Sequence, residues 1–550
     1  MSKAQIRKYT KEFLNYLEKQ YKIRPILYTN RDFYKRYFAE EADFKGYRFW
    51  IAHYYVTDFD MPGDEPWHFW QHSDRGNVNG INDRFDFSGV PPRVEDLGTV
   101  HLIAIGGAGM SAVARLLMAR GVPVQGSDAK DSPLLRALAA EGARVWVGHD
   151  RRHLEGADTV VISSAIRDSN PELAQAKSQG LRILHRSQAL AATAWDQVRL
   201  AVAGANGKTT TTSLLIAALD GAGASPSFAS GGELADRGTN ADWHADSPFV
   251  IEADESDGSF LVYHPHVAAI TNVQPDHLDF YGTFDNVRAA YAAFAATVPP
   301  GGLVVACADD EGSNALAAQV SDRRVLTYGH ALHADLVILE SALASTGSTT
   351  TFRDPAGVER TMTLAVPGAH NVLNACAAYL CATEGVGAHP DGVVAGLARF
   401  AGARRRFEVI GEAGGITVVD DYAHNAGKVE AVVATATKIA HDRGGRLIAI
   451  FQPHLYSRTR DFAEGFAAGL APADEIALLD IYGAREEPIP GVDSRLIADR
   501  LAGRADVMSP DAAVEWAASI AKPGDVVLTI GAGDITVIAP HILERLGSRR

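Results

Sequence analysis

The chain has 550 residues, 47% of them hydrophobic and 22% charged, which excludes a disordered tail, a collagen-like repeat and a single small domain; at about 100–200 residues per domain we expect three to five domains. The net charge of −15 argues against nucleic acid as a partner, because tracking phosphates needs a basic surface. No apolar run approaches the ~18 residues of a membrane span and the first residues are too polar for a signal peptide, so the sequence predicts a cytoplasmic protein with no membrane partner.

Residues 1–87 differ in composition from the rest of the chain. They contain seven lysines, against six in all that follows, and dense runs of aromatic residues. Apolar spacing predicts a helix after Thr10 and then three short strands, in ILYTN, RFWIAHYYV and WHFWQHS. The segments IRPILYTNRDFYKRYF, FWIAHYYV and PWHFWQHSDRGNVNGINDRFDF resemble the last strands of glycoside hydrolase family 25 muramidases, whose fold is a (β/α)-barrel.

This resemblance covers about half of such a barrel. A glycosidase needs two carboxylates flanking the scissile bond, and the family's Asp-x-Glu pair belongs to the half that is absent. Asp64-Glu65 lies beside Pro66 in a loop-like stretch and is a poor substitute. Because a half barrel leaves unpaired strand edges, we expect an inactive or misfolded appendage, with a sugar-binding remnant as the alternative. Residues 88–98, SGVPPRVEDLG, are the expected linker.

From residue 99 onward, predicted strands and helices alternate. VHLIAIGGAGMSAVARLL indicates a buried strand, a glycine-rich turn and a helix, where backbone amides can approach a diphosphate. Taken alone, a glycine-rich turn of this kind is as consistent with a tight structural turn as with nucleotide binding. Asp128, at the end of the second strand, is placed to accept a hydrogen bond from a ribose hydroxyl and favours nucleotide binding. Ser163 and Ser164 end a further strand, at the edge where α/β sheets bind ligands.

The strongest signal follows the strand VRLAVA. Gly-x-x-Gly-Lys-Thr at residues 204–209, between strand and helix, predicts a P-loop, although Val202 replaces the first glycine of the longer Walker pattern. Backbone amides would cradle phosphate, Lys208 would reach the β and γ phosphates, and Thr209 would offer its hydroxyl to magnesium.

Hard metal ligands follow the next two strands. Glu252, Asp254, Glu255 and Asp257 come at the end of one apolar strand, and Asp276-His277 after the next. Magnesium is usually held by one or two carboxylates together with water and nucleotide phosphates. Any one of these acids alone would be an ordinary solvated charge, but together they predict a cation site opposite the P-loop.

Nine segments in order resemble the Mur ligase family, most closely its alanine-adding branch: IGGAGMSA, GKTTTT, EADESDGSF, TNVQPDHLDFYG, PGAHNVLNACAA, GARRRFE, DDYAH, FQPHLYSRTRDF and GAGDI. The resemblance implies an α/β fold of three domains: a Rossmann-like UDP-substrate domain at 99–195, a P-loop ATP-binding domain at 196–400 and a Rossmann-like C-terminal domain at 401–550. It implies ATP-dependent ligation of L-alanine to the carboxylate of UDP-N-acetylmuramate through an acyl phosphate, for peptidoglycan synthesis. ATP and Mg²⁺ are the implied cofactors, and the protein would be a monomer or a homodimer.

The family's functional positions carry over residue by residue. The implied ATP-binding residues are Gly204, Ala205, Asn206, Gly207, Lys208, Thr209, Thr210, His370, Asn371, Asn374, Arg406 and Asp421. The implied UDP-substrate residues are Gly106, Gly107, Ala108, Gly109, Met110, Ser111, Asp128, Ser163 and Ser164. The amino-acid pocket would be Tyr422, His454 and Arg458, the catalytic residues Lys208, His424, His454 and Arg458, and the metal ligands Thr209, Glu255 and His277.

Two departures from the family pattern keep alternatives open. Ala205-Asn206 replaces the branch's Thr-His, and residues 425–428, Asn-Ala-Gly-Lys, replace His-Pro-Thr-Glu. The alternatives are a catalytically impaired nucleotide- and UDP-sugar-binding protein, a peptide-adding ligase of cell-wall recycling, and a bifunctional muramidase-ligase. No lysine lies between Lys208 and Lys428, so the carbamylated lysine that several Mur ligases use is unavailable from the central domain.

Overall fold

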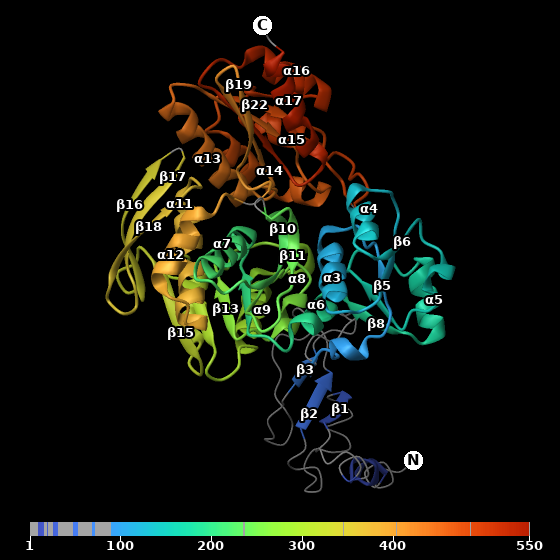
Figure 1. Ribbon diagram of the computed structural model, residues 1–550. Coiled ribbons are helices and arrows are strands. Elements are labelled where there is room, and N and C mark those ends of the chain that lie inside the picture. Colours follow the sequence, from blue (N-terminus) through green and yellow to red (C-terminus); the bar gives the residue numbers. More distant parts are fainter. Residues whose placement is uncertain are drawn as a thin grey trace.

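The computed structural model describes residues 9–15, 19, 90–234, 237–344, 346–402, 404–484 and 486–548, and the backbone of three strands nearer the N-terminus. The described strands form four sheets (Figure 1). None of the helices in this part of the chain is long and apolar enough to cross a membrane.

The N-terminal segment contains a small parallel sheet. Residues 9–15 are helical, and the sheet has the order β1-β2-β3, with Ile26 opposite Arg48 and Trp50 opposite Phe69. The strands are β1 (Ile26–Asn30), β2 (Arg48–Ala52) and β3 (Phe69–Gln71). Three parallel strands joined by long connections agree with the predicted barrel fragment. Asp64-Glu65 lies outside the described residues.

The first domain after the N-terminal segment is a doubly wound parallel sheet in the order β6-β5-β4-β7-β8. Its strands are β4 (Val100–Ile103), β5 (Val124–Asp128), β6 (Arg144–Val147), β7 (Thr159–Ile162) and β8 (Arg182–His185). Its helices are α3 (Ala108–Ala119), α4 (Pro133–Ala140), α5 (Pro171–Gln179) and α6 (Arg186–Ala194). The strand order reverses between β4 and β7, and such a switch point is where these folds bind nucleotides.

The central sheet has the order β11-β10-β12-β9-β13-β14-β15-β16-β17-β18. Its strands are β9 (Arg199–Ala203), β10 (Ser227–Leu234), β11 (Thr239–Asp242), β12 (Phe249–Glu252), β13 (Val267–Ile270), β14 (Leu303–Cys307), β15 (Arg324–Gly329), β16 (Leu336–Ala344), β17 (Gly347–Arg353) and β18 (Glu359–Leu364). β10, β12, β9 and β13 to β16 run parallel, whereas β11, β17 and β18 pair antiparallel at the two ends. β9, at the centre, leads directly into the P-loop.

The α-helices that the structure describes beside this sheet are α7 (Lys208–Gly221), α8 (Leu278–Tyr281), α9 (Phe284–Ala296), α10 (Glu311–Gln319), α11 (Ala369–Leu380) and α12 (Pro390–Arg399). α7 packs against α11 and α12, and a Cβ atom at Gly396 would lie 2.1 Å from the Ala217 carbonyl oxygen. Glycine at this crossing therefore brings α12 close to α7, which carries the P-loop lysine.

The C-terminal sheet has the order β19-β20-β24-β21-β22-β23, and only β19 pairs antiparallel. Its strands are β19 (Glu408–Ala413), β20 (Ile416–Asp421), β21 (Leu447–Phe451), β22 (Glu475–Leu478), β23 (Ala505–Val507) and β24 (Val526–Ile530). Its helices are α13 (Ala426–Asp442), α14 (Tyr456–Leu470), α15 (Arg495–Ala498), α16 (Pro510–Ile520) and α17 (Ile538–Gly547). In Figure 1 this domain lies above the central one, with α13 and α14 on the side that faces the central domain.

Candidate active site

Glycine geometry shapes the loop between β9 and α7. Gly204 has φ 138° and Gly207 has φ 85°, a region that side-chain-bearing residues rarely adopt. A Cβ atom would lie 2.0 Å from Thr271 Oγ1 at the first position and 2.6 Å from Asn374 Oδ1 at the second. Gly207 caps α7 without a side chain, so the first N–H groups of the helix remain directed toward an incoming phosphate.

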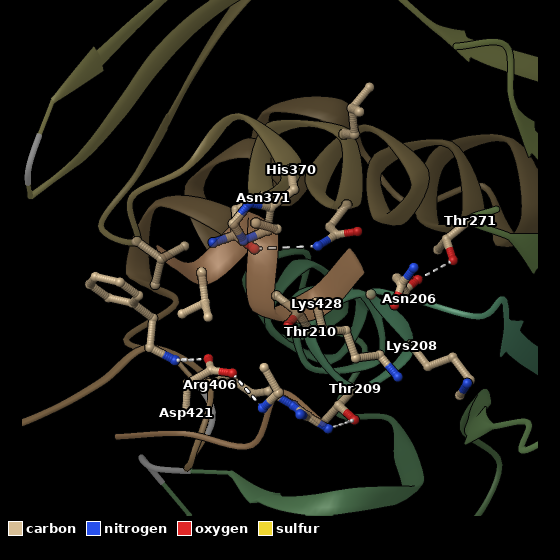
Figure 2. A pocket seen from close by; sticks show the side chains of 18 of the residues that line it. Asn206, Lys208, Thr209, Thr210, Thr271, His370, Asn371, Arg406, Asp421 and Lys428 are labelled. Atoms are coloured by element: carbon tan, nitrogen blue, oxygen red, sulfur yellow. Dashed lines mark hydrogen bonds between the residues drawn. The ribbon is translucent and has the colours of Figure 1, made fainter. Parts of the chain in front are cut away.

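This loop opens into a cavity of about 1000 Å³ between the central and C-terminal domains (Figure 2). The volume is in the range that holds a nucleotide-sized ligand. All the ATP-binding residues expected from the sequence except Gly204 line the cavity: Ala205, Asn206, Gly207, Lys208, Thr209, Thr210, His370, Asn371, Asn374, Arg406 and Asp421. The structure thus brings together residues more than 200 positions apart in the sequence.

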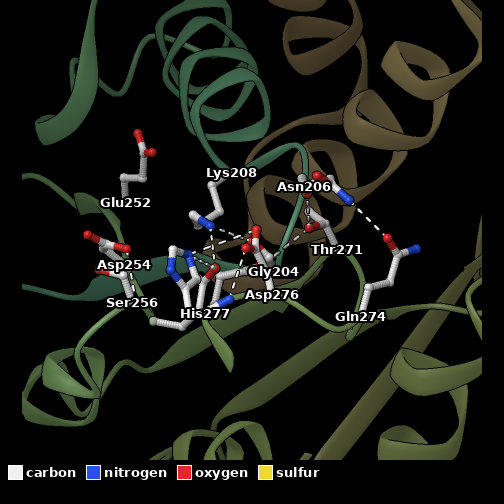
Figure 3. Close-up of polar contacts among 12 residues, drawn as sticks. Gly204, Asn206, Lys208, Glu252, Asp254, Ser256, Thr271, Gln274, Asp276 and His277 are labelled. Atoms are coloured by element: carbon white, nitrogen blue, oxygen red, sulfur yellow. Dashed lines mark hydrogen bonds and ion pairs between the residues drawn. The ribbon is translucent and has the colours of Figure 1, made fainter. Parts of the chain in front are cut away.

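Carboxylates contact the P-loop lysine and threonine. Lys208 Nζ donates to the Gly204 carbonyl oxygen and to Glu255 Oε1, both at 2.7 Å (Figure 3). The Thr209 hydroxyl donates to Glu252 Oε1 at 2.8 Å. Burial alone would lower the pKa of Lys208, but Glu255 and Asp254 outweigh it and raise that pKa. Lys208 is therefore a permanent cation at the base of the cavity.

The same group of residues suits a magnesium ion. Glu255 is 2% exposed, and its Oε2 atom has no hydrogen-bond partner among the described residues; His277 Nε2 lies 3.7 Å from the other oxygen. An unpaired buried carboxylate oxygen on a residue that contacts the P-loop lysine fits a hard cation. No three His, Cys, Asp or Glu side chains in the described ranges form a metal cage by themselves, and nucleotide-bound Mg²⁺ needs only one or two.

Two acids of the same segment have other roles. Asp254 Oδ2 accepts from Arg186 Nη2 at 2.9 Å, and Asp257 Oδ2 accepts from the Ser164 hydroxyl at 2.5 Å. Both contacts join the first domain to the central one. Donors of the first domain therefore bind Asp254 and Asp257, and a part for these two acids at the cation stays a prediction.

The unusual Asn206 is held on both sides. Its backbone N–H donates to Asn272 Oδ1 at 2.8 Å, and its side-chain amide donates to Gln274 Oε1 at 2.9 Å. Its carbonyl oxygen accepts from the Thr271 hydroxyl at 2.6 Å. Although Asn206 departs from the family pattern, these three hydrogen bonds hold the P-loop in place (Figures 2 and 3).

The C-terminal domain reaches the P-loop through an arginine. Arg406 Nη2 donates to Thr209 Oγ1 at 3.0 Å, and its guanidinium carbon lies 5.0 Å from the centre of the Tyr422 ring. Asp421 accepts from the backbone N–H groups of Phe407 and Ala423 at 2.7 and 2.8 Å. Asp421 thus orders the loop that carries Arg406, in addition to lining the cavity.

The residues expected for the amino-acid pocket also meet. The ring centres of Tyr422 and His424 are 5.2 Å apart and those of His424 and His454 are 6.0 Å apart. Arg458 Nη1 donates to the His424 carbonyl oxygen at 3.4 Å, and its Nη2 lies 4.0 Å from Asp276 Oδ1. Burial, with Lys428 and Arg458 nearby, holds the pKa of His424 well below its usual range, so this imidazole is neutral.

In the first domain the glycine-rich turn is held by Asp128. Its Oδ2 accepts from the Gly106 N–H at 3.0 Å, so this carboxylate supports the turn. Gly107, Ala108 and Gly109 begin α3, whereas Met110 and Ser111 are buried, at 4% and 0% exposure, and can offer a ligand only their backbone. Ser163 and Ser164 follow β7, at the switch point of the sheet.

Two further residues beside these sites were missed by the sequence reasoning. A Cβ atom at Gly109 would lie 2.6 Å from Arg186 Nη1, which places this cation against the glycine-rich turn of residues 106–109. Tyr482 stacks on His454 with ring centres 5.8 Å apart. Arg186 and Tyr482 follow the ends of β8 and β22, and this position at a strand end could have predicted them as site residues.

The central domain carries a P-loop on a parallel sheet, and a doubly wound domain lies beside it. A third domain supplies an arginine to the nucleotide cavity. These features define a multidomain enzyme that uses ATP. Three family models match the chain in order: Mur ligase family, catalytic domain, at 99–197; Mur ligase middle domain at 202–382; and Mur ligase, glutamate ligase domain, at 405–533. Residues 1–81 match glycosyl hydrolases family 25.

Relatives and solved structures agree with these matches. The UDP-N-acetylmuramate–L-alanine ligases of Kineococcus radiotolerans and Thermobifida fusca are 51% and 49% identical, each over 83% of this chain and 98% of theirs. A crystal structure of UDP-N-acetylmuramate-alanine ligase from Thermotoga maritima superposes with TM-score 0.69 at 28% identity, over 82% of this chain and all of that one. A murein peptide ligase from Psychrobacter arcticus gives 0.61 at 25% identity, over 82% and 99%. The chain belongs to the Mur ligase family, as its nine segments indicated.

Proposed function

We propose that the protein joins L-alanine to the lactyl carboxylate of UDP-N-acetylmuramate at the expense of ATP, giving UDP-N-acetylmuramoyl-L-alanine for peptidoglycan synthesis. One observation carries the proposal most directly. In a chain about half identical to L-alanine ligases over nearly their whole length, Asp276 lies 3.9 Å from Lys428 of the P-loop cavity and 4.0 Å from Arg458, which contacts the His424 carbonyl oxygen. Because ATP and UDP-linked sugars are nucleotides of the cell interior, we place the reaction in the cytoplasm.

The reaction has two steps. A carboxylate oxygen of UDP-N-acetylmuramate attacks the γ-phosphorus of ATP, so that ADP leaves and an acyl phosphate forms. The amine of L-alanine then attacks the acyl carbon, phosphate leaves, and the amine loses a proton to give the amide. Lys208 and the N–H groups at the start of α7 offset the charge that develops on the phosphoryl oxygens.

His424 is suited to take the proton. Its Nδ1 lies 2.9 Å from the Tyr422 carbonyl oxygen, an acceptor that only a protonated Nδ1 can satisfy. In a neutral imidazole the proton on Nδ1 leaves Nε2 as a base, and the lowered pKa keeps His424 neutral at pH 7. The fork of donors on Arg458 would hold the carboxylate of L-alanine.

Magnesium accompanies the nucleotide in this proposal. Thr209 and Glu255 would hold it, with His277 beside Glu255 and Glu252 beside Thr209. When bound, the cation offsets charge on the phosphates. On the UDP side, Arg186 and the backbone of residues 106–111 would bind the diphosphate, and Ser163 and Ser164 lie at the same sheet edge.

Peptide addition is the second candidate function, favoured by the structural similarity to a murein peptide ligase. It has weaker support, because the relatives that match at 45–51% identity carry the name of L-alanine ligases. Release of ADP and phosphate by the full chain tests the main proposal. We expect release to require ATP, UDP-N-acetylmuramate and L-alanine together and to stop when a chelator removes Mg²⁺; release that is independent of the UDP-sugar would contradict it.

A further inference from the structure

The first turn of α13 brings a second lysine into the nucleotide cavity. Lys428 lines the cavity together with Lys208, Thr209 and Arg406 (Figure 2). Asn425 caps the helix, since its Oδ1 accepts from the Lys428 backbone N–H at 2.9 Å, and the first turn contains no acidic residue. A cation at the positive end of a helix is unfavourable locally, so helix formation does not explain this lysine.

The nearest charged partner of Lys428 belongs to the central domain. Lys428 Nζ lies 3.9 Å from Asp276 Oδ2, which also accepts from Asn425 Nδ2 at 2.8 Å. The longer separation exceeds hydrogen-bond length, so Asp276 attracts the ammonium group without fixing it. Asp276 is 8% exposed, and its carboxylate keeps the lysine side chain directed across the boundary between the two domains.

The position of Lys428 singles out one part of the nucleotide. On one side lies Lys208 in the P-loop, and on the other lies Arg458, whose Nη2 is 4.0 Å from the second oxygen of the same Asp276. The terminal phosphate has to occupy this junction, because it is transferred to the carboxylate that the amino acid later attacks. Burial, with the charge of Lys208 nearby, lowers the pKa of Lys428 to about 8, and an added anion would relieve that cost.

We propose that Lys428 is a second phosphate-binding lysine, which contacts the terminal phosphate of ATP from the C-terminal domain, opposite Lys208, and then the phosphate of the acyl intermediate. The contact with ATP rests on the cavity alone, and the contact with the acyl phosphate rests on the proposed function. Because ADP lacks the terminal phosphate, the second lysine makes the closed cavity selective for ATP over ADP.

Binding to the full chain tests this proposal without turnover. Calorimetry would compare a non-hydrolysable ATP analogue and ADP, each with Mg²⁺, for the wild type, Lys428→Met, Lys428→Arg and Lys438→Met. Lys438 is the matched control, since it lies on the same helix with its side chain 57% exposed and paired with Asp442. We expect Lys428→Met to weaken the analogue about 10- to 100-fold and ADP less than about threefold. Lys428→Arg restores most of the affinity, and Lys438→Met changes neither.

Two results would overturn the proposal. Unchanged affinity for the analogue in Lys428→Met would show that the lysine does not contact the phosphate. An equal loss for the analogue and for ADP would show that Lys428 only supports the pairing of the domains through Asp276. Retained ADP binding reports that the variant is folded. None of these measurements involves L-alanine, so they stand even if the protein adds a different acceptor; if it adds L-alanine, Lys428→Met lowers kcat and leaves the KM for L-alanine unchanged.

Discussion

Arg458 is the side chain best placed to recognise an amino-acid carboxylate. It is held by the His424 carbonyl oxygen and lies near Asp276, which belongs to the central domain. Lysine keeps the charge but loses the planar fork of donors. We expect Arg458→Lys to raise the KM for L-alanine about 10- to 100-fold and to leave the KM for ATP nearly unchanged, as initial rates of ADP release would measure.

Arg460→Lys is the matched control for this substitution. Arg460 lies two residues further along the same helix, half-exposed and paired with its neighbour Asp461, so its replacement should leave both constants unchanged. If Arg458→Lys instead raised the KM for ATP with no effect on L-alanine, Arg458 would belong to the nucleotide site and the proposed amino-acid pocket would be wrong.

The residues of the site differ in how well the sequence could predict them. The P-loop and the nucleotide-side residues lie in short motifs, and the structure gathers nearly all of them around one cavity. Arg186 and Tyr482 have no motif, because they reach their sites through the ends of distant strands. Asp254 looked like a metal ligand, but its partner Arg186 comes from another domain, which spacing along the chain does not reveal.

At the scale of elements, the start of α5 is tied to the first sheet by one buried carboxylate. Glu172 is fully buried, with Oε2 3.2 Å from His101 Nε2 and accepting from the Ser127 hydroxyl, and with Oε1 2.8 Å from His153 Nδ1. Burial alone would raise its pKa, but these hydrogen bonds outweigh burial and hold the pKa at about 2. Ionised Glu172 therefore stabilises the first domain.

The sign of the pH dependence follows from the lowered pKa. Since the value in the folded protein lies below the ordinary one near 4.5, the stabilisation is complete above that pH and is lost as the pH falls toward 2. We expect Glu172→Gln to cost about 3 kcal/mol at pH 7 and about half as much at pH 3. Thermal unfolding of the first domain, measured at pH 7, 4 and 3, provides the comparison with the wild type.

Glu155→Gln serves as the control, because Glu155 is an exposed glutamate of the same domain, and its replacement should leave the midpoint unchanged at each pH. A constant difference between Glu172→Gln and the wild type across this range would mean that the carboxylate stabilises the domain by its shape and hydrogen bonds alone and not by its charge.

Elements close to the motifs were well predicted, since apolar strands and glycine turns are local patterns. The strands before the diphosphate turn and the P-loop are β4 and β9, and the first domain has the doubly wound order. The antiparallel extension β16-β17-β18 at the end of the central sheet was not foreseen, because its strands carry no chemical motif and their register depends on pairing with β15.

At the scale of the whole molecule, the composition divides the chain near residue 87, and the family matches divide it in the same region, with one ending at 81 and the next beginning at 99. The exact domain boundaries and the oligomeric state stay predictions. The ligase matches cover most of the residues that line the nucleotide cavity; Phe400, Ala401 and Gly402 lie between two of the matches. We therefore expect the N-terminal segment to take no part in the ligase reaction.

Removal of residues 1–87 tests this view. We expect a chain that begins at Ser88 to retain kcat and each KM within about twofold of the full chain, because the described residues that line the cavity all lie beyond the removed part. The two proteins would be compared by initial rates of ADP release at equal concentration. A large loss of activity, or insolubility of the shorter chain, would show that the segment supports the ligase fold.

The central claim is that this cavity ligates L-alanine, and competition between acceptors tests it most directly. The full chain would be incubated with ATP, Mg²⁺, UDP-N-acetylmuramate and equal amounts of L-alanine, glycine, L-serine and a tripeptide that begins with L-alanine, and the UDP-linked products identified by mass spectrometry. Our account predicts UDP-N-acetylmuramoyl-L-alanine as the main product. A product that carries the tripeptide, or unchanged UDP-N-acetylmuramate although both nucleotides bind, would contradict it.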